Sequence, residues 1–343
     1  MTNRFKPPVG PPKILIIKPS SLGDIIHALQ VLAMLYEDFP GAGIDWVVAR
    51  GFHEILEDHP MIRRLWVIDK NAWKKARNAW ATLGDLRTLA RGLRRERYDI
   101  VIDLQGLFRS AMIGLFTGSA ERVGWQSARE GARFTYKYRV GFHPEIHAVE
   151  RNIQLAEFVG CRMREPSFPF PPIEISPDIL RILPREYAVI APFAATAVKS
   201  WPARNFAELV SRLPLPSVIV GGASDARLAD EMAAGSNGRA ISLAGKTGLR
   251  ELAAIISRAR FFVSADTGPM HMAAALNVPV FAIFGPTNPV RTGPYGSIHT
   301  VIRKEMPCSP CYKRRPCDDW GCMSDITPEM VLKAIENGAA CPA

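Results

Sequence analysis

The sequence predicts an α/β protein with two domains, each built on a parallel β-sheet with helices on both faces. Short apolar, β-branched segments alternate with helical patterns along the chain, and this order is typical of parallel sheets. The alternation stops at residues 166–184, where six of 19 positions are proline, and then starts again. A length of 343 residues agrees with two domains, because one domain contains about 150 residues.

The first domain is predicted at residues 13–165 and begins with a buried strand. Residues 13–18, Lys-Ile-Leu-Ile-Ile-Lys, form a short β-branched run, as expected for a parallel strand that is covered on both faces. A polar turn follows, and an apolar periodic run at 25–35 predicts a helix. Further strands are predicted at 44–49, 65–68 and 100–104, with helices between them.

A long amphipathic helix is predicted at residues 71–98. Its apolar residues recur at steps of three, four or one, which places them on one helical face. Two interpretations are open for the other face, a solvated basic surface or a platform for an anionic surface or a phosphorylated acceptor. That face carries Lys74, Lys75, Arg77, Arg87, Arg91, Arg94, Arg95 and Arg97.

Residues 166–184 are predicted to form a semi-rigid linker, because proline fixes φ and removes a hydrogen-bond donor. The second domain is predicted at residues 185–337, with the same alternation. Its strands are predicted at 187–191, 217–220, 261–264 and 280–284. Its helices are predicted at 206–213, 249–259 and 270–276.

Composition and charge narrow the class of protein. Apolar residues make up 48% and charged residues 22%, which excludes a disordered or fibrous chain. With 43 Lys and Arg against 33 Asp and Glu, the net charge of +10 favours polyanionic partners such as nucleic acid, phosphorylated lipid or nucleotide. The N-terminal apolar run Ile14–Ile17 is too short for a secretory signal, and no run is long enough for a transmembrane helix. We therefore expect a cytoplasmic protein that can attach to a membrane surface.

The first candidate site is the turn Ser20-Ser21-Leu22-Gly23-Asp24, which follows the first strand. Open α/β folds bind ligands at the carboxyl ends of their strands, and a helix N-terminus there offers free N–H groups to anions. The turn contains a single glycine, so the dinucleotide-binding fingerprint is absent. Asp24 is either a capping residue of the helix or a general base that stays ionised at pH 7.

The second candidate site is the segment Ser264-Ala-Asp-Thr-Gly-Pro-Met-His271, which follows a strand and opens a helix. Asp266 and Thr267 are predicted to cap this helix, and Gly268 allows a ligand to approach the backbone. Free N–H groups together with Thr267 would suit a diphosphate, and His271 lies near the same helical face. Helix capping without a ligand is the alternative interpretation.

Two further segments are expected beside this site. Phe284-Gly-Pro-Thr-Asn-Pro289 follows the next strand, at a similar edge of the sheet, and can complete the pocket. Lys199 follows a strand within Thr196-Ala-Val-Lys-Ser200. It can neutralise a phosphate as a point charge, or it is an ordinary surface lysine.

Four of the six cysteines fall within 15 residues, at Cys308, Cys311, Cys317 and Cys322. A C-x2-C pair with two more cysteines nearby is a signal for a structural zinc site, although the spacing of four in the second pair is at the loose end of the usual range. Free or redox-active thiols are the alternative. In a reducing cytoplasm, a metal site and free thiols are both more common than disulfides.

Several of these segments together resemble a known family. The run Ile14–His27, combined with 264–271 and 284–288, is similar to the family 9 glycosyltransferases, which are ADP-heptose:lipopolysaccharide heptosyltransferases. The resemblance extends from about residue 13 to 337, with the motifs in the family's order. Other segments look most like the type I members, namely Asp45-Trp-Val-Val48 with Gly51-Phe52, and residues 101–107, 125–130 and 147–151.

This resemblance implies a GT-B architecture, with two facing Rossmann-like domains and the active site in the cleft between them. The N-terminal domain would hold the acceptor, Kdo-bearing lipid A, and the C-terminal domain the donor, ADP-heptose. Asp24 matches the family's catalytic base. The positions that match donor binding are Lys199, Thr196, Thr247, Asp266, Thr267, Gly268 and His271. The implied acceptor-binding residues are Ser21, Gly23, Lys74 and Arg129.

One departure from the family pattern concerns the donor site. Type I members usually carry a Thr-Thr pair before the phosphate-binding lysine, whereas this chain has Ala194-Ala195-Thr196. Thr196 is expected to take over this contact after a shift of one or two residues. Family enzymes of this kind do not depend on a metal, so no cofactor is expected for catalysis, and a zinc ion on the cysteines would be structural.

The implied reaction is transfer of heptose with inversion. Asp24 would take the proton of the acceptor hydroxyl, while Lys199 and the backbone at 267–268 would hold the negative charge on departing ADP. The basic helix and Arg129 would attract the polyanionic acceptor at the cytoplasmic face of the inner membrane, and nucleic acid is not an expected partner.

Three alternatives stay open. The first is heptosyltransferase II or another family 9 transferase with a different acceptor. The second is a nicotinamide-dependent oxidoreductase, which the missing glycine fingerprint opposes. The third is a basic, zinc-bearing nucleic-acid-binding protein, which would bind oligonucleotides in a salt-sensitive way.

Overall fold

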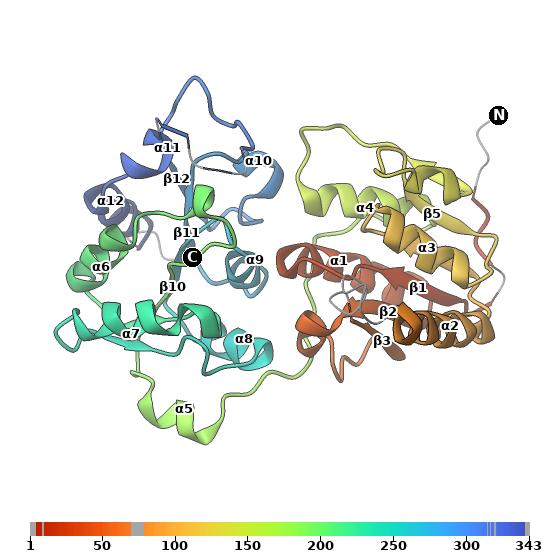
Figure 1. Cartoon of the computed structure of the whole chain (residues 1–343), viewed down its shortest axis with the longest axis horizontal. Coiled ribbons are helices and arrows are strands. Elements are labelled where there is room, and N and C mark those ends of the chain that lie inside the picture. Colours follow the sequence, from red (N-terminus) through yellow and green to blue (C-terminus); the bar gives the residue numbers. More distant parts are fainter. Residues whose placement is uncertain are drawn as a thin grey trace. The chain divides into compact units, whose positions relative to one another are not determined.

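The chain divides into two compact units, Met1–Pro172 (unit 1) and Ile173–Ala343 (unit 2). The computed structural model describes residues 5–8, 10–69, 79–313, 315, 317, 318 and 320–339. Each unit contains a six-stranded sheet whose strands are all parallel (Figure 1). The division falls inside the Pro-rich segment 166–184, which also contains the short helix α5 (Pro177–Ile182).

Unit 1 has the strand order β3-β2-β1-β4-β5-β6. This is the Rossmann order, in which the chain changes direction beside β1 and ligands bind outside the carboxyl ends of the strands. The strands are β1 (Lys13–Ile17), β2 (Gly43–Ala49), β3 (Arg64–Ile68), β4 (Ile100–Asp103), β5 (Arg122–Trp125) and β6 (Tyr138–Val140). The helices are α1 (Leu22–Asp38), α2 (Ala79–Glu96), α3 (Phe108–Phe116) and α4 (Ala148–Phe158), with 3-10 turns at Arg50–Ile55 and Ala132–Thr135.

Helices cover both faces of the unit 1 sheet, which explains the continuous apolar run of β1. Leu15 and Ile17 pack against Leu93 of α2 and Ile113 of α3. Because successive side chains of a strand point to opposite faces, Ile14 and Ile16 lie on the other face, and both are fully buried. Gly92 allows α2 to lie close to β3, since a Cβ at this position would be 2.8 Å from the Trp66 ring.

Unit 2 repeats the same topology with the order β12-β11-β10-β7-β8-β9. Its strands are β7 (Ala188–Ala191), β8 (Ser217–Ile219), β9 (Ala240–Ser242), β10 (Phe261–Ala265), β11 (Val280–Phe284) and β12 (Thr300–Arg303). After α5 its helices are α6 (Ala203–Arg212), α7 (Ala226–Ala234), α8 (Leu249–Ser257), α9 (Gly268–Ala275), α10 (Pro289–Thr292), α11 (Gly321–Ser324) and α12 (Pro328–Ala339), with 3-10 turns at Ala197–Lys199 and Ala223–Asp225.

The structure confirms the predicted α/β class and the predicted strands, whose bounds differ by one residue at most at either end. Four strands were not predicted: β5, β6, β9 and β12. The long basic helix is described as α2 from residue 79, and the predicted part at 71–78 lies outside the described residues. In the described part of the chain, no helix has the length and hydropathy needed to cross a membrane.

Candidate functional site

The predicted site residues of unit 1 lie on loops at one edge of its sheet. Because the strands are parallel, the loops that follow β1, β4 and β5 all leave the sheet at its carboxyl edge. Ser21 ends the turn after β1, Gly23 and Asp24 lie in the first turn of α1, and the loop after β5 carries Arg129. Lys74, predicted as an acceptor-binding residue, lies outside the described residues.

Asp24 is both a capping residue and an accessible carboxylate. It is the third residue of α1, and its Oδ2 accepts hydrogen bonds from the Ser21 backbone N (3.1 Å) and the Ser21 Oγ (2.8 Å). Its side chain nevertheless stays 39% exposed. The two sequence-based interpretations of Asp24 are therefore compatible, because the capping geometry holds the carboxylate in place without covering it. Gly23 is buried and Ser21 is exposed.

Lys18 controls the charge state of Asp24. Its Nζ lies 3.5 Å from Asp24 Oδ1 and donates to the backbone oxygen of Leu104 (3.1 Å), and its side chain is only 5% exposed. Burial alone would raise the pKa of Asp24, but the Lys18 ammonium and the hydrogen bonds from Ser21 lower this pKa well below its usual range. Asp24 is thus ionised at pH 7, as a general base has to be. Burial also lowers the pKa of Lys18 itself.

Asp103 organises the neighbouring β4 loop. This carboxylate is 2% exposed, and its Oδ1 accepts hydrogen bonds from the backbone N of Gln105 (2.9 Å) and Gly106 (3.0 Å). Its Oδ2 accepts from Ser110 Oγ (2.8 Å) and Tyr136 OH (2.7 Å). Burial raises the pKa of Asp103, although these four hydrogen bonds act in the opposite direction.

The β4 loop connects the other loops at this edge. The Gln105 side-chain Oε1 accepts a hydrogen bond from the Ser20 backbone N (3.4 Å), and the Gly106 backbone oxygen accepts one from the Arg129 backbone N (3.0 Å). Asp103 therefore supports the turn that carries Asp24 and the turn that carries Arg129. Neither Lys18 nor Asp103 was predicted as a functional residue.

In unit 2, Lys199, Asp266 and Thr287 meet at the carboxyl edge of the sheet. They follow β7, β10 and β11, which are adjacent strands. Asp266 Oδ2 accepts hydrogen bonds from Lys199 Nζ (2.6 Å) and Thr287 Oγ1 (2.8 Å). The predicted capping role of Asp266 is therefore wrong, since its carboxylate pairs with Lys199 and Thr287. The helix α9 has Thr267 as its N-cap, and the Thr267 side chain makes no capping hydrogen bond.

The N-terminus of α9 combines free backbone donors with an unpartnered hydroxyl. The first N–H groups of a helix have no partner within it, and in the first turn of α9 Gly268 and Met270 carry such groups while Pro269 has none. Thr267 Oγ1 is buried and has no hydrogen-bond partner among the described residues. Lys199 keeps 31% of its side chain exposed, so an anion can reach its ammonium. Gly268 is the first residue of α9, and His271, its fourth residue, is 7% exposed.

The remaining predicted donor residues lie on loops of the same sheet edge. Thr196 is exposed, and its backbone oxygen accepts from Lys199 N (3.1 Å). Thr247 is half-buried in the loop between β9 and α8. Two strand spacings, or about 10 Å, separate β9 from β7. An elongated ligand that lies across the strand ends would therefore be needed to contact both Thr247 and Lys199.

The predicted zinc site is not supported by the structure. Cys322 is buried in the unit 2 core with Met323 and Ile326, whereas Cys308 is exposed and Cys311 and Cys317 are half-buried. Among the described residues, no group of three or more His, Cys, Asp or Glu side chains is placed to hold a metal ion. The four cysteines are close in sequence, but one of them belongs to the core.

Comparisons with known proteins agree with this pair of Rossmann-like units. The sequence model of glycosyltransferase family 9 (heptosyltransferase) matches residues 86–319. Lipopolysaccharide heptosyltransferase 1 of Pseudomonas aeruginosa is 35% identical over 323 residues, which cover 88% of this chain and 86% of that protein. Lipopolysaccharide heptosyltransferase 2 of Escherichia coli is 27% identical, covering 94% and 97%.

A solved structure shares the fold over 95% of this chain. The E. coli heptosyltransferase WaaC with ADP has a TM-score of 0.78 and 28% identity, covering 95% of this chain and 99% of that one. The same protein has also been solved with ADP-2-deoxy-2-fluoro heptose, with a TM-score of 0.77. These neighbours confirm the predicted GT-B class. The predicted cleft between the domains stays a prediction.

Proposed function

We propose that this chain, which belongs to glycosyltransferase family 9, transfers heptose from ADP-heptose to the Kdo region of lipid A in lipopolysaccharide inner-core synthesis. This is the reaction that we expect of a type I heptosyltransferase. The identity to a type 1 relative, 35%, exceeds the 27% to a type 2 relative. The ADP and ADP-heptose analogue complexes of a similar structure support a nucleotide-sugar donor.

The observation that carries the donor proposal is the cluster at the start of α9. Lys199 supplies a positive charge, α9 supplies free N–H groups, and Thr267 supplies a buried hydroxyl without a partner. These groups fit a diphosphate, whose oxygens accept hydrogen bonds and whose charge is stabilised at a helix N-terminus. Asp266, whose Oδ2 also accepts a hydrogen bond from Thr287 Oγ1, holds the Lys199 ammonium at this position.

In the proposed reaction Asp24 acts as the general base. The acceptor hydroxyl oxygen bonds to the anomeric carbon of heptose while the bond from that carbon to the diphosphate oxygen breaks, and the hydroxyl proton passes to Asp24. The low pKa of Asp24 makes it a weak base in the free enzyme. Proton transfer is therefore expected late, when bond formation has made the hydroxyl acidic. Lys199 and the α9 amides stabilise the negative charge that develops on ADP.

The acceptor and its location are part of the proposal. The net charge of +10 attracts a polyanionic lipid, which fits an enzyme working at the cytoplasmic face of the inner membrane. Ser21, Gly23 and Arg129, which lie on loops or in the first turn of α1, are assigned to acceptor binding. No cofactor is required in this reaction scheme, because an aspartate base and cationic and amide donors supply the needed chemistry.

Release of ADP from ADP-heptose tests the proposal when two acceptors are compared. One acceptor is Kdo-bearing lipid A, and the other already carries the first heptose. We expect release with the first acceptor only. Release with the second acceptor only would replace the proposed function by that of a type II enzyme, while no release with either would contradict the donor or the acceptor assignment.

A further inference from the structure

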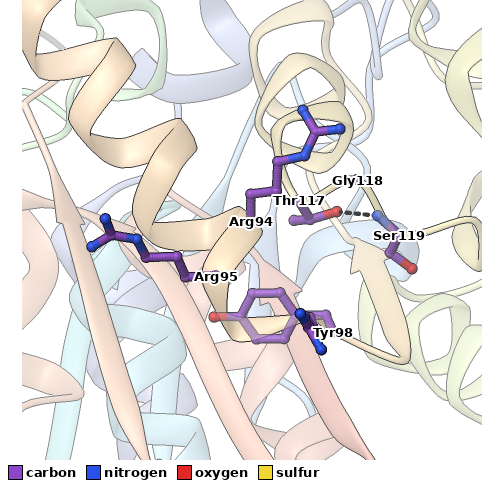
Figure 2. Close-up of a pocket in the computed structure, with 7 residues that line it drawn as sticks. Arg94, Arg95, Tyr98, Thr117, Gly118 and Ser119 are labelled. Atoms are coloured by element: carbon purple, nitrogen blue, oxygen red, sulfur yellow. Dashed lines mark hydrogen bonds between the residues drawn. The ribbon is translucent and has the colours of Figure 1, made fainter.

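A pocket of about 640 Å³ lies in unit 1 at the amino ends of the strands, whereas Asp24 lies at their carboxyl ends. It is lined by Arg94, Arg95, Arg97, Tyr98 and the turn 117–119. Tyr98 comes just before β4 and the turn comes just before β5, so the pocket is at the amino ends of these strands. Figure 2 shows Arg94 and Arg95 projecting from the end of α2 beside Tyr98 and this turn.

The three arginines carry positive charge that their surroundings leave uncompensated. In the part of the chain that the structure describes, Arg94, Arg95 and Arg97 form no ion pair, and all three are exposed. Two nearby glutamates are already paired with other cations, and the exposed Asp99 carboxylate accepts a hydrogen bond from the Lys13 backbone N (2.8 Å). Glu96 binds Lys13, Arg63 and Arg64, and Glu121 binds Lys137.

The neutral polar groups of the pocket are occupied by internal hydrogen bonds. Thr117 Oγ1 donates to the Gly114 backbone oxygen (2.7 Å) and accepts from Ser119 N (3.1 Å) (Figure 2). Tyr98 OH donates to Asp45 Oδ2 (2.5 Å), so its ring is fixed and its hydroxyl points away from solvent. The Tyr98 and Thr117 hydroxyls are therefore already engaged, and the guanidinium groups are the charged donors that a ligand can use.

The backbone of Arg97 adds an independent observation. This residue follows α2 directly and has a φ of +53°, in the left-handed region where helix ends favour glycine. Favourable contact with the helix dipole explains basic residues in the last turn, such as Arg94 and Arg95. Other side chains of this protein, such as Glu130 and Tyr312, adopt the same conformation, so the value for Arg97 identifies a position where glycine can replace arginine without strain.

We propose that this pocket binds a phosphate-bearing anion with two or more phosphate groups, at a site separate from the donor and acceptor loops. A guanidinium group pairs with phosphate oxygens through two parallel hydrogen bonds, so three of them supply enough donors for two phosphate groups. The volume is within the range of about 300–1,000 Å³ that small-ligand sites have. The phosphates belong either to a soluble anion or to a lipid headgroup.

Equilibrium dialysis with radiolabelled inorganic pyrophosphate tests this site in the full-length protein. The pocket variant is Arg94→Gln/Arg95→Gln/Arg97→Gln, and the matched control is Arg185→Gln/Arg258→Gln/Arg260→Gln, which removes the same charge from exposed positions of unit 2. We expect the pocket variant to bind one pyrophosphate fewer than the parent protein, and the control to bind the same number. Equal binding by the pocket variant and the parent would overturn the proposal.

The single variant Arg97→Gly removes one guanidinium group and is expected to fold, because the backbone conformation at this position favours glycine. It therefore separates loss of the site from loss of folding. We expect it to weaken pyrophosphate binding at this site several-fold while the melting temperature stays equal or rises. Unchanged affinity in Arg97→Gly would also contradict the proposal. This result is independent of heptose transfer, so the pocket and the proposed function can fail separately.

Vesicle flotation identifies the source of the phosphate. Phosphatidylcholine vesicles with and without phosphatidate are mixed with the parent protein, the pocket variant and the control. Binding to phosphatidate vesicles that is lost only in the pocket variant assigns the site to a lipid headgroup. Lost pyrophosphate binding with unchanged vesicle binding assigns it to a soluble anion.

Discussion

The Lys18 ammonium lies 3.5 Å from the Asp24 carboxylate, and this ion pair lowers the pKa of Asp24 below its usual range. Asp24 is 39% exposed, whereas Lys18 is 5% exposed, so the lysine acts from behind the turn and leaves the carboxylate accessible. The proposed base is therefore kept charged by a group that a substrate cannot reach. This relationship makes the pH dependence of the enzyme the first property to test.

Replacing Lys18 by methionine is expected to raise the pKa of Asp24, because burial then acts without the compensating ammonium. The parent enzyme should keep a flat kcat/KM down to about pH 4, the ordinary value for aspartate. In Lys18→Met the acid limb should move up by about 1–3 pH units. Lys137→Met, which breaks an exposed ion pair with Glu121, is the control. An unmoved acid limb in Lys18→Met would exclude control of Asp24 by Lys18.

Removing the Lys199 ammonium is expected to weaken ADP binding more than adenosine binding, because only ADP carries the phosphates. A charge-assisted hydrogen bond contributes about 1.5–3 kcal/mol, so Lys199→Ala should lose about 10- to 100-fold in ADP affinity. Calorimetric titration with both ligands checks this, with exposed Lys333→Ala as the control. Equal losses for ADP and adenosine would argue against a phosphate contact.

The buried Thr267 hydroxyl is expected to lower the free energy of unfolding of the ligand-free protein and to contribute to ADP binding. Its Oγ1 is buried without a partner among the described residues, so Thr267→Val should raise the free energy of unfolding by about 1 kcal/mol. ADP binding should weaken in the same variant. Ser217 Oγ is likewise buried and unpartnered but lies at the amino end of β8, so Ser217→Ala should stabilise the protein and leave ADP binding unchanged. Unchanged ADP affinity in Thr267→Val would remove this hydroxyl from the donor site.

Asp103 is expected to matter for acceptor binding through the loops that it supports. Asp103→Ala leaves two backbone N–H groups and the Tyr136 hydroxyl without their acceptor, whereas Ser110 Oγ can still donate to the Leu107 oxygen; the loss should cost about 2–4 kcal/mol of stability. The KM for the acceptor should rise while ADP affinity changes little. The control is Asp99→Ala, an exposed aspartate that accepts one bond from the Lys13 backbone. A loss of ADP affinity equal to the rise in KM would indicate general unfolding.

Strands made of apolar, β-branched runs were predictable from local sequence, whereas short strands that contain polar residues were not. All buried positions of β1 are apolar, and all buried positions of β4 are apolar except Asp103, which marks both as central strands. By contrast, β5 (Arg122–Trp125) and β6 (Tyr138–Val140) are short and contain arginine. They are strands because β5 pairs with β4 and β6 pairs with β5. These pairings join residues that are distant in sequence, so the local sequence does not reveal them.

The candidate site was predictable where the chemistry lies in a local motif. Asp24 and the start of α9 both sit at a strand–turn–helix junction, which the order of residues reveals. Lys18 and Asp103 are ordinary residues at strand ends, and their roles depend on distant partners such as Leu104, 86 positions after Lys18. Likewise, Lys199 and Asp266 pair although they are 67 positions apart. The local sequence predicted Asp266 as a helix cap because it does not show this distant partner.

The most direct test of the proposed function is the mass of the lipid product formed from ADP-heptose and Kdo-bearing lipid A. The parent protein should add one heptose unit to the acceptor. Asp24→Asn should add none while it binds ADP with unchanged affinity, since the base assists transfer and lies outside unit 2. An acceptor that keeps its mass with folded, ADP-binding parent protein, or one that gains heptose at the parental rate with Asp24→Asn, would contradict the account.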